Sequence, residues 1–284
     1  MKEAKGRDKM TRTVHHIVQS LHEWAPPKTK MDYDNVGLLV GSSQQSVQNI
    51  LVCLDVTEQI VDEAIAKNCD LIVAHHPLIF KKLAQIQPDK GHGSIIYKLI
   101  KHDIAVFASH TNLDAAYNGV SYQLAQTIGL QQVEFLDPYE NQENAGMGAI
   151  GDLEAPCNKE QFLAHLADAL QTESIRYSGS VDSLARIAVC GGAGVFLKEQ
   201  AQRAGADAFV TADVKYHDYF NKTDNFLLVD VGHFESEYPI ITEIKKYLLN
   251  FDPELNVLIA DTYTNPMRVY NPHKNQSTYN TSNT

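Results

Sequence analysis

The sequence predicts an α/β protein built on a largely parallel sheet, arranged as one large domain or as two lobes. Two observations predict this class. Short apolar runs alternate with helical segments early in the 284-residue chain and again late in it, and such alternation is typical of βαβ units. The middle of the chain is Gly-rich and strand-like instead, which favours antiparallel or mixed pairing there.

The first predicted element is a helix at 14–24. Its apolar residues recur three or four positions apart, which is the spacing of one helix face. Pro26 and Pro27 follow and end the helix. The sequence Asp34-Asn35-Val36-Gly37 then indicates a loop.

Three buried strands come next, with helices between them. Apolar runs of strand length lie at 50–54, 71–74 and 104–108. Helices are expected at 57–67, where Thr57 can act as the N-cap, and at 94–101. Because helices separate the strands, we expect the strands to pair in parallel.

The middle and the end of the chain complete the pattern. In the middle, a strand at 145–153 is followed by a helix that Asn158 caps and a second strand at 174–177. The alternation of strand and helix then returns. One predicted strand ends at 188–190, and further strands are predicted at 208–211, 226–231 and 257–260. Helices are predicted at 194–204 and 239–249.

The two alternating stretches resemble one another. Each opens on a similar run, Ile50-Leu51-Val52-Cys53 in the first and Ile187-Ala188-Val189-Cys190 in the second. Each continues through a helix to strands whose ends carry histidine or carboxylate. An internal duplication and a chance likeness both explain this pattern, and the sequence leaves both open.

Histidines follow three of the predicted strands. His75 and His76 follow one strand, and His110 and His233 each follow another. Ligands in open α/β sheets bind beside the carboxyl ends of strands. If the two stretches are related halves, their strand ends would gather these imidazoles in one crevice.

An acid follows each of the later histidines at a spacing of four, Asp114 after His110 and Glu237 after His233. A carboxylate can bridge two cations, and adjacent imidazoles can each bind one metal of a pair about 3.5–4 Å apart. We therefore favour a dinuclear site. Nitrogen and oxygen ligands suit zinc, iron or manganese. The candidate metal ligands are His75, His76, Asp114, His233 and Glu237.

His110 has two possible roles. It can bind a metal, or it can orient Asp114 or the substrate from beside the metals. We favour the second role and predict His110 as the catalytic residue.

Composition limits the classes of function. The net charge of −11 disfavours general nucleic-acid binding. The apolar runs are too short to span a membrane, and the charged segment 1–10 is no secretory signal, so we expect a cytoplasmic protein. The four cysteines form no C-x-x-C pair, which argues against a disulfide scaffold or a thiolate zinc site.

Two further segments admit two interpretations each. The glycines of 191–194 can cradle a phosphate on backbone amides or form a tight turn, and we favour the turn. Asp213, Lys215 and His217 can line the crevice, with Lys215 facing an anionic substrate, or they can lie in a solvated loop.

In six segments taken together, the chain resembles the family of GTP cyclohydrolase 1 type 2 homologues, the NIF-three-like family. The resemblance extends from about residue 11 to 268. The segments that carry it are Asp34 to Gly41, His75-His76-Pro77, Ser109 to Asp114, Ala188 to Gly194, Ala212 to His217 and Val231 to Glu237.

The resemblance implies a dinuclear centre and a fold. In that family the matching residues His75, Asp114 and Glu237 hold one ion. His76, His233 and the shared Glu237 hold the other. It also implies two linked α/β lobes with mixed, partly parallel sheets, and a toroidal homohexamer whose metal sites face the central cavity.

From these implications we expect a division of the chain. Residues 11–129 plus 229–268 form a metal-binding lobe, and residues 130–228 form a second α/β lobe. Residues 1–10 and 269–284 are expected to be disordered tails.

Two hypotheses of function follow. The first is a hydrolase, dependent on two divalent ions per chain, that acts on a nucleotide or another purine-like anionic small molecule. The alternative is a non-enzymatic metal-binding ring that acts as a scaffold or metallochaperone. An enzyme should keep an open coordination position and a cavity lined by Lys215 and His217, whereas a scaffold should close the pocket.

Overall fold

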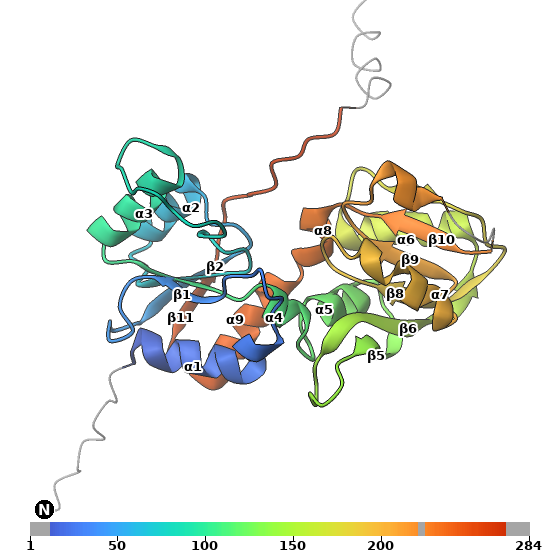
Figure 1. Ribbon diagram of the computed structural model, residues 1–284, viewed down its shortest axis with the longest axis horizontal. Coiled ribbons are helices and arrows are strands. Elements are labelled where there is room, and N and C mark those ends of the chain that lie inside the picture. The colour runs from blue at the N-terminus through green and yellow to red at the C-terminus, as the bar shows by residue number, and fades with distance from the viewer. Residues whose placement is uncertain (1–11, 221–224, 271–284) are drawn as a thin grey trace, which may run out of the picture.

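The computed structural model describes residues 12–220 and 225–270. It contains a five-stranded sheet and a six-stranded sheet, both mixed. Figure 1 shows them in two lobes that lie side by side, with the chain crossing between them near its middle and returning near its end. The predicted α/β class with two linked lobes is confirmed.

The first sheet takes its strands from both ends of the chain. They are β1 (Gly37–Val40), β2 (Asn49–Cys53), β3 (Leu71–Ala74), β4 (Ala105–Ala108) and β11 (Asn256–Ile259). The order across the sheet is β1-β4-β3-β2-β11. β1 runs antiparallel to β4, and the remaining pairs are parallel. The carboxyl ends of β2, β3 and β4 therefore lie at one edge.

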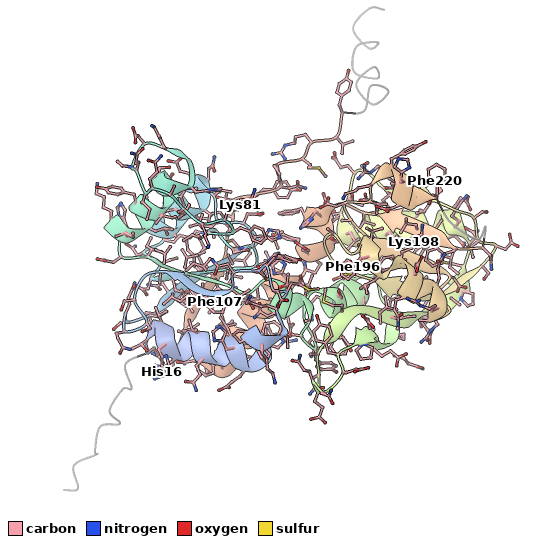
Figure 2. All side chains as sticks on the ribbon, in the orientation of Figure 1. His16, Lys81, Phe107, Phe196, Lys198 and Phe220 are labelled. Carbon is pink, nitrogen blue, oxygen red and sulfur yellow. The ribbon has the colours of Figure 1, made fainter. Side chains whose placement is uncertain are left out.

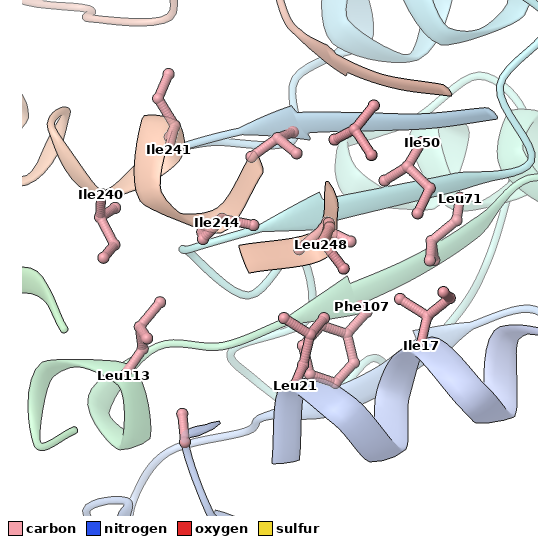
Figure 3. Packing of buried hydrophobic residues seen from close by; sticks show 14 of the residues in the cluster. Ile17, Leu21, Ile50, Leu71, Phe107, Leu113, Ile240, Ile241, Ile244 and Leu248 are labelled. Atoms are coloured by element: carbon pink, nitrogen blue, oxygen red, sulfur yellow. The ribbon is translucent and has the colours of Figure 1, made fainter. Parts of the chain in front are cut away.

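Helices cover both faces of this sheet. One face carries α1 (Val14–Trp24) and α9 (Ile240–Phe251), and the other carries α2 (Glu58–Ala66) and α3 (Gly91–Lys101). Successive residues of a strand point to opposite sides of the sheet. Because helices cover both sides, the strand residues are buried on both faces. Ile50 packs with the first pair of helices, and its neighbour Leu51 packs with the second. Figure 3 shows Ile17 and Leu21 of α1 beside Phe107 of β4.

The second sheet is built mainly from the middle of the chain. Its strands are β5 (Gln131–Pro138), β6 (Gly146–Cys157), β7 (Arg176–Ser178), β8 (Leu184–Val189), β9 (Ala208–Thr211) and β10 (Leu227–Asp230). The order is β5-β6-β8-β9-β10-β7, with β8, β9 and β10 parallel and the other pairs antiparallel. α5 (Val120–Thr127) and α6 (Lys159–Leu170) cover one face, and α7 (Lys198–Arg203) packs on the other.

The sequence-based elements correspond to these helices and strands, apart from shifts of a few residues at their ends and the differences that follow. β1 and β5 were not predicted. β5 is largely exposed, and its polar residues interrupt the apolar pattern. The helix expected at 194–204 begins as a 3-10 turn at Val195–Leu197. A short helix, α8 (His233–Glu237), precedes the predicted helix α9. The remaining short elements are η1 (Pro27–Thr29), α4 (Thr111–Asp114) and η3 (Tyr216–Tyr219).

The two parallel triplets, β2-β3-β4 and β8-β9-β10, share a hydrogen-bond arrangement. Asp70 precedes β3, and its Oδ2 accepts hydrogen bonds from the backbone amides of Gln48 and Asn49, each at 2.8 Å. Asp207 precedes β9, and its Oδ2 likewise accepts from two consecutive amides, at 2.8 and 2.9 Å. A shared detail of this kind lies beyond the apolar pattern, and it favours the duplication over a chance likeness.

The division into lobes remains our proposal, with one detail added by the sheets. β10 pairs with β9 and β7, so residues 229 and 230 lie in the six-stranded sheet. Of the expected tails, residues 1–10 and 271–284 lie outside the described residues. Among the helices of the described ranges, none has both the length and the apolar character that a membrane crossing requires.

Glu63 of α2 gives a testable contribution to stability. Its carboxylate accepts hydrogen bonds from Lys67 and from the amides of Asp261 and Thr262, at 2.7 to 2.9 Å, and so ties the chain after β11 to α2. Burial opposes ionisation, but these donors lower the pKa of Glu63 from 4.5 to about 2. The contribution to stability is thus present above pH 4.5 and is lost as the pH falls toward 2.

We predict that Glu63→Gln lowers the free energy of unfolding at pH 7 by about 1–3 kcal/mol. The difference from the native chain should shrink as the pH falls from 4.5 toward 2, as urea unfolding at several pH values would show. Glu58→Gln, on the exposed side of the same helix, is the control. A difference that stays constant with pH would contradict this account of Glu63.

Candidate metal centre

The six predicted site residues come from strand ends and from two short helices. β3 ends at Ala74, and the chain bends there so that both His75 and His76 turn toward one point. Their ring centroids lie 4.9 Å apart. His110 follows β4 and is the N-cap residue of α4, whose last residue is Asp114. His233 and Glu237 are the first and last residues of α8.

One group of side chains consists of His75, Asp114 and Glu237. His75 Nε2 lies 3.5 Å from Asp114 Oδ1 and 3.8 Å from Glu237 Oε2. His75 is fully buried, and Glu237 is 3% exposed. The three ligand atoms lie within 4.8 Å of one another, close enough to hold one metal ion.

A second group consists of His76, His233 and Glu237. The same atom, Glu237 Oε2, lies 2.9 Å from His76 Nε2 and 3.1 Å from His233 Nε2. These three atoms also lie within 4.8 Å of one another. Glu237 therefore belongs to both groups, and its carboxylate can bridge two cations.

Three of the candidate metal-ligand atoms lack hydrogen bonds within the described residues. His75 Nε2, Asp114 Oδ1 and Glu237 Oε2 are buried, and none has a hydrogen-bond partner among the described residues. A buried polar atom without a partner costs about 1–3 kcal/mol, more when it is charged. Positive ions between these atoms would remove that cost. The residues present therefore fit the metal ions that the sequence predicts, and these buried histidine and carboxylate groups can bind them.

Each of the four histidines is held through Nδ1 by an oxygen acceptor. His75 donates to the backbone carbonyl of Ser109 at 2.9 Å. The other three donate to carboxylates at 2.8 Å. These pairs are His76 with Asp55, His110 with Asp34, and His233 with Asp213. Such acceptors fix the tautomer and leave Nε2 free as a ligand or proton acceptor.

The sequence analysis missed two of these acceptors. It did not single out Asp55, and it placed Asp34 only within a loop. Asp55 follows the carboxyl end of β2 by two positions. The rule that selected the histidines, a polar residue at a strand end, would have found it.

A glycine makes room for Glu237. The backbone of Gly192 passes so close that a Cβ there would lie 2.2 Å from Glu237 Oε1, and its φ of +62° also favours glycine. The amide of Gly192 donates to Ser236 Oγ, and that of Gly194 donates to Thr211 Oγ1. Because these amides already have partners, the geometry favours the tight turn over the phosphate cradle.

Burial and pairing with opposite charges shift the pKa values of the central residues in opposite directions. Burial disfavours the charged form of His76, but Asp55 and Glu237 raise its pKa to about 10. Burial acts in the same way on His233, whose pKa the carboxylates of Glu237 and Asp213 raise to about 9. The surrounding histidines hold the pKa of Glu237 well below its ordinary value despite its burial. Positive charge is therefore favoured around Glu237, as protons or as metal ions.

His110 lies beside both groups. A ring nitrogen of His110 is within 4.8 Å of ring nitrogens of His75 and His76. The centroid of its ring is 5.5 Å from that of His76. Asp34, which holds Nδ1, is itself buried and accepts from Thr111. This geometry permits both roles considered for His110, a ligand and a proton carrier.

A cavity opens at the centre, but not where we expected it. It has a volume of about 510 Å³ and begins at His76 and Asp55. Lys215 and His217 are absent from its lining, and His217 lies instead in a small pocket on the second lobe. The expected lining was wrong because the segment after Pro77 supplies most of the wall, and that segment carries no periodic sequence signal. The lining residues are Asp55, Val56, Thr57, His76, Pro77, Leu78, Phe80, Lys81, Lys82, Leu83 and His92.

Comparison with known protein families gives a match over nearly the whole described chain. A family model described as Duf34/NIF3 (NGG1p interacting factor 3) matches residues 12–266. A GTP cyclohydrolase 1 type 2 homolog of Clostridium acetobutylicum is 33% identical over 242 residues, which cover 84% of this chain and 90% of the relative. A protein of the same name from Clostridium perfringens is 30% identical over 258 residues, covering 89% and 98%.

Solved structures show the same fold. A hypothetical protein of Staphylococcus aureus matches with a TM-score of 0.86 at 30% identity, covering 92% of this chain and 100% of that one. A Bacillus cereus protein related to NIF3 matches with a TM-score of 0.84 at 28% identity, covering 92% and 99%. The resemblance inferred from the six sequence segments is thereby confirmed.

The hydrogen bond between Asp55 and His76 gives a prediction about metal affinity. We expect Asp55→Asn to weaken binding of Zn²⁺ about 10–100-fold, because a neutral amide accepts a weaker hydrogen bond from His76 Nδ1 and raises the basicity of the ring less than a carboxylate does. Competition with a chromophoric chelator measures the change. Asp62→Asn, an exposed acid on α2, is the control. Equal affinities for the native chain and Asp55→Asn would remove the role given to Asp55.

Proposed function

The chain belongs to the Duf34/NIF3 family, and from that premise we propose that it is a hydrolase dependent on two divalent metal ions. The proposed ligands are His75, Asp114 and Glu237 for one ion, and His76, His233 and Glu237 for the other. Zinc, iron or manganese suits these nitrogen and oxygen donors. The proposed substrate is a nucleotide or another purine-like anionic small molecule.

One observation supports a pair of ions above all. Glu237 Oε2 is buried, makes no hydrogen bond within the described residues, and is shared by both ligand groups. A single ion would leave part of one group unsatisfied. Two ions would satisfy both groups through one bridging carboxylate.

The side chains around the centre suggest how the reaction proceeds. When bound, a pair of divalent ions would make water nucleophilic at neutral pH and withdraw charge from the bond that breaks. Asp34 holds Nδ1 of His110, so the other ring nitrogen of His110 can accept or deliver a proton beside His75 and His76. Asp55 and Asp213 keep the rings of His76 and His233 in place during the reaction.

The cavity favours an enzyme over a scaffold. A scaffold would be expected to close its metal site, whereas here about 510 Å³ adjoins His76. Such a volume lies in the range of small-molecule sites. The names of the curated relatives, GTP cyclohydrolase 1 type 2 homolog, make GTP the first substrate to test.

The assembly and the location belong to the same proposal. The family resemblance supports a toroidal homohexamer with its metal sites facing the central cavity, and we propose a cytoplasmic location. The acidic charge of −11 speaks against general nucleic-acid binding. Light scattering of the purified protein measures the mass and thus the number of chains.

Metal content tests the ligand assignment. We predict about two ions per native chain, about one for Asp114→Asn, and a loss of both ions for Glu237→Gln. The reason is that Asp114 belongs to one ligand group, whereas Glu237 belongs to both ligand groups. Elemental analysis after dialysis measures the content, and Glu160→Gln in α6 is the control. Full occupancy in Glu237→Gln would contradict the bridging role.

The role of His110 is tested separately. If it carries a proton, His110→Gln keeps both ions and lowers turnover of GTP about 10²–10⁴-fold. If it is a ligand, the metal content falls together with activity. Parallel metal analysis and product chromatography distinguish these outcomes, and an active, fully loaded His110→Gln would exclude both roles.

A further inference from the structure

We propose that the loop after His76-Pro77, formed by residues 78–83 together with His92, binds a planar aromatic ring that carries a phosphate group. This inference rests on the proposed function and adds the part of the site that recognises the substrate. The proposed metal ligands follow strand ends or lie in the short helices α4 and α8, whereas this loop connects β3 to α3 and lines the cavity beside them. Phe80 would contact the ring, and Lys81 and Lys82 the phosphate.

The cavity joins this loop directly to the metal centre. Its wall includes His76, a proposed ligand, and Asp55, the carboxylate that orients His76. The same wall continues through Phe80, Lys81 and Lys82. A molecule bound along the loop would therefore reach the metal ions at one end.

Phe80 provides an aromatic surface beside the centre. It is 46% exposed although it is a large apolar side chain. Its ring lies between two others, with centroids 6.2 Å from His110 and 6.3 Å from Tyr33. Tyr33 is itself 69% exposed. An exposed aromatic ring in the cavity wall, with a second exposed ring against it, is suited to stacking with a planar ring.

Lys81 and Lys82 provide the positive charge. Both side chains are exposed, and within the described part of the chain neither forms an ion pair with an acid. Figure 2 shows Lys81 at the side of the first lobe that is nearest the second. In a chain with a net charge of −11, two adjacent unpaired cations in a cavity wall mark a place for an anion.

The loop is anchored at both ends. Leu78 is buried in the core beneath it, and Asn35 Nδ2 donates to the carbonyl of Ile79 at 2.6 Å. At the other end, the amide of Gln87 lies where a Cβ of Gly93 would be only 2.9 Å away. These contacts fix where the loop starts and returns. Phe80, Lys81 and Lys82 are thus held over the cavity.

Isothermal titration of the full chain loaded with Zn²⁺ tests the cationic part. We expect the native chain to bind GTP more tightly than guanosine, because only GTP carries phosphates. Lys81→Ala/Lys82→Ala should weaken GTP binding about tenfold or more and leave guanosine binding unchanged. Lys28→Ala/Lys101→Ala removes the same charge at exposed positions away from the cavity and is the matched control.

Variants of Phe80 test the aromatic part. Phe80→Ala should weaken binding of guanosine and GTP by a similar factor of about ten, because stacking involves the ring alone. Phe80→Tyr retains an aromatic surface and should bind both as the native chain does. Inorganic triphosphate should bind Phe80→Ala and the native chain equally.

The outcomes separate this inference from the proposed function. Two results overturn the inference and leave the metal centre intact, provided that the metal content is full. The first is a GTP affinity that the lysine and Phe80 variants do not change, and the second is a native chain that does not bind GTP. Binding that depends on these residues without any turnover of GTP supports the inference and contradicts the hydrolase. Metal analysis of each variant accompanies every titration, so that a lost ion is not mistaken for a lost contact.

Discussion

The buried carboxylate of Glu237 is the group around which the site is organised. It is 3% exposed, lies near the imidazoles of His75, His76 and His233, and shares its surroundings with a second acid, Asp114, whose Oδ1 is buried. Two acids cannot be buried together at low cost unless positive charge accompanies them. The carboxylates of Glu237, Asp55 and Asp213 raise the pKa values of His76 and His233, which reflects this demand for positive charge. Metal ions would satisfy the same requirement with better geometry.

The two lobes are needed together to build this arrangement. The five-stranded sheet delivers His75 and His76 through β3, whereas α8, which carries Glu237, follows β10 of the six-stranded sheet. Gly192, which follows β8, has no side chain and so leaves space for the same carboxylate. Cations bound between the lobes would link them, so occupancy of the site and the relative placement of the two sheets are coupled.

The sequence was sufficient for whatever depends on strand ends. The apolar runs before His75 and His110 are unbroken, and only Asp230 interrupts the run before His233. The rule that ligands bind beside the carboxyl ends of strands then brings the histidines together. Asp34 was harder to find, because it lies in a loop and its hydrogen bonds to His110 and Thr111 leave no periodic pattern in the sequence. The cavity wall was mislocated for a related reason. An anchored loop depends on contacts such as Asn35 with Ile79, which join segments far apart in the chain.

This contrast between strands and loop bears on how such a site acquires a substrate. The proposed ligands follow buried strands directly or lie in the short helices after them, and acceptors at Nδ1 hold the histidine rings, so their positions leave little freedom for change. The loop that bears Phe80, Lys81 and Lys82 is exposed beyond its two anchors and can change without disturbing the core. A shared metal centre therefore does not determine a shared substrate. In this chain the residues beside His76, more than the ligands themselves, would decide which molecule the centre acts on.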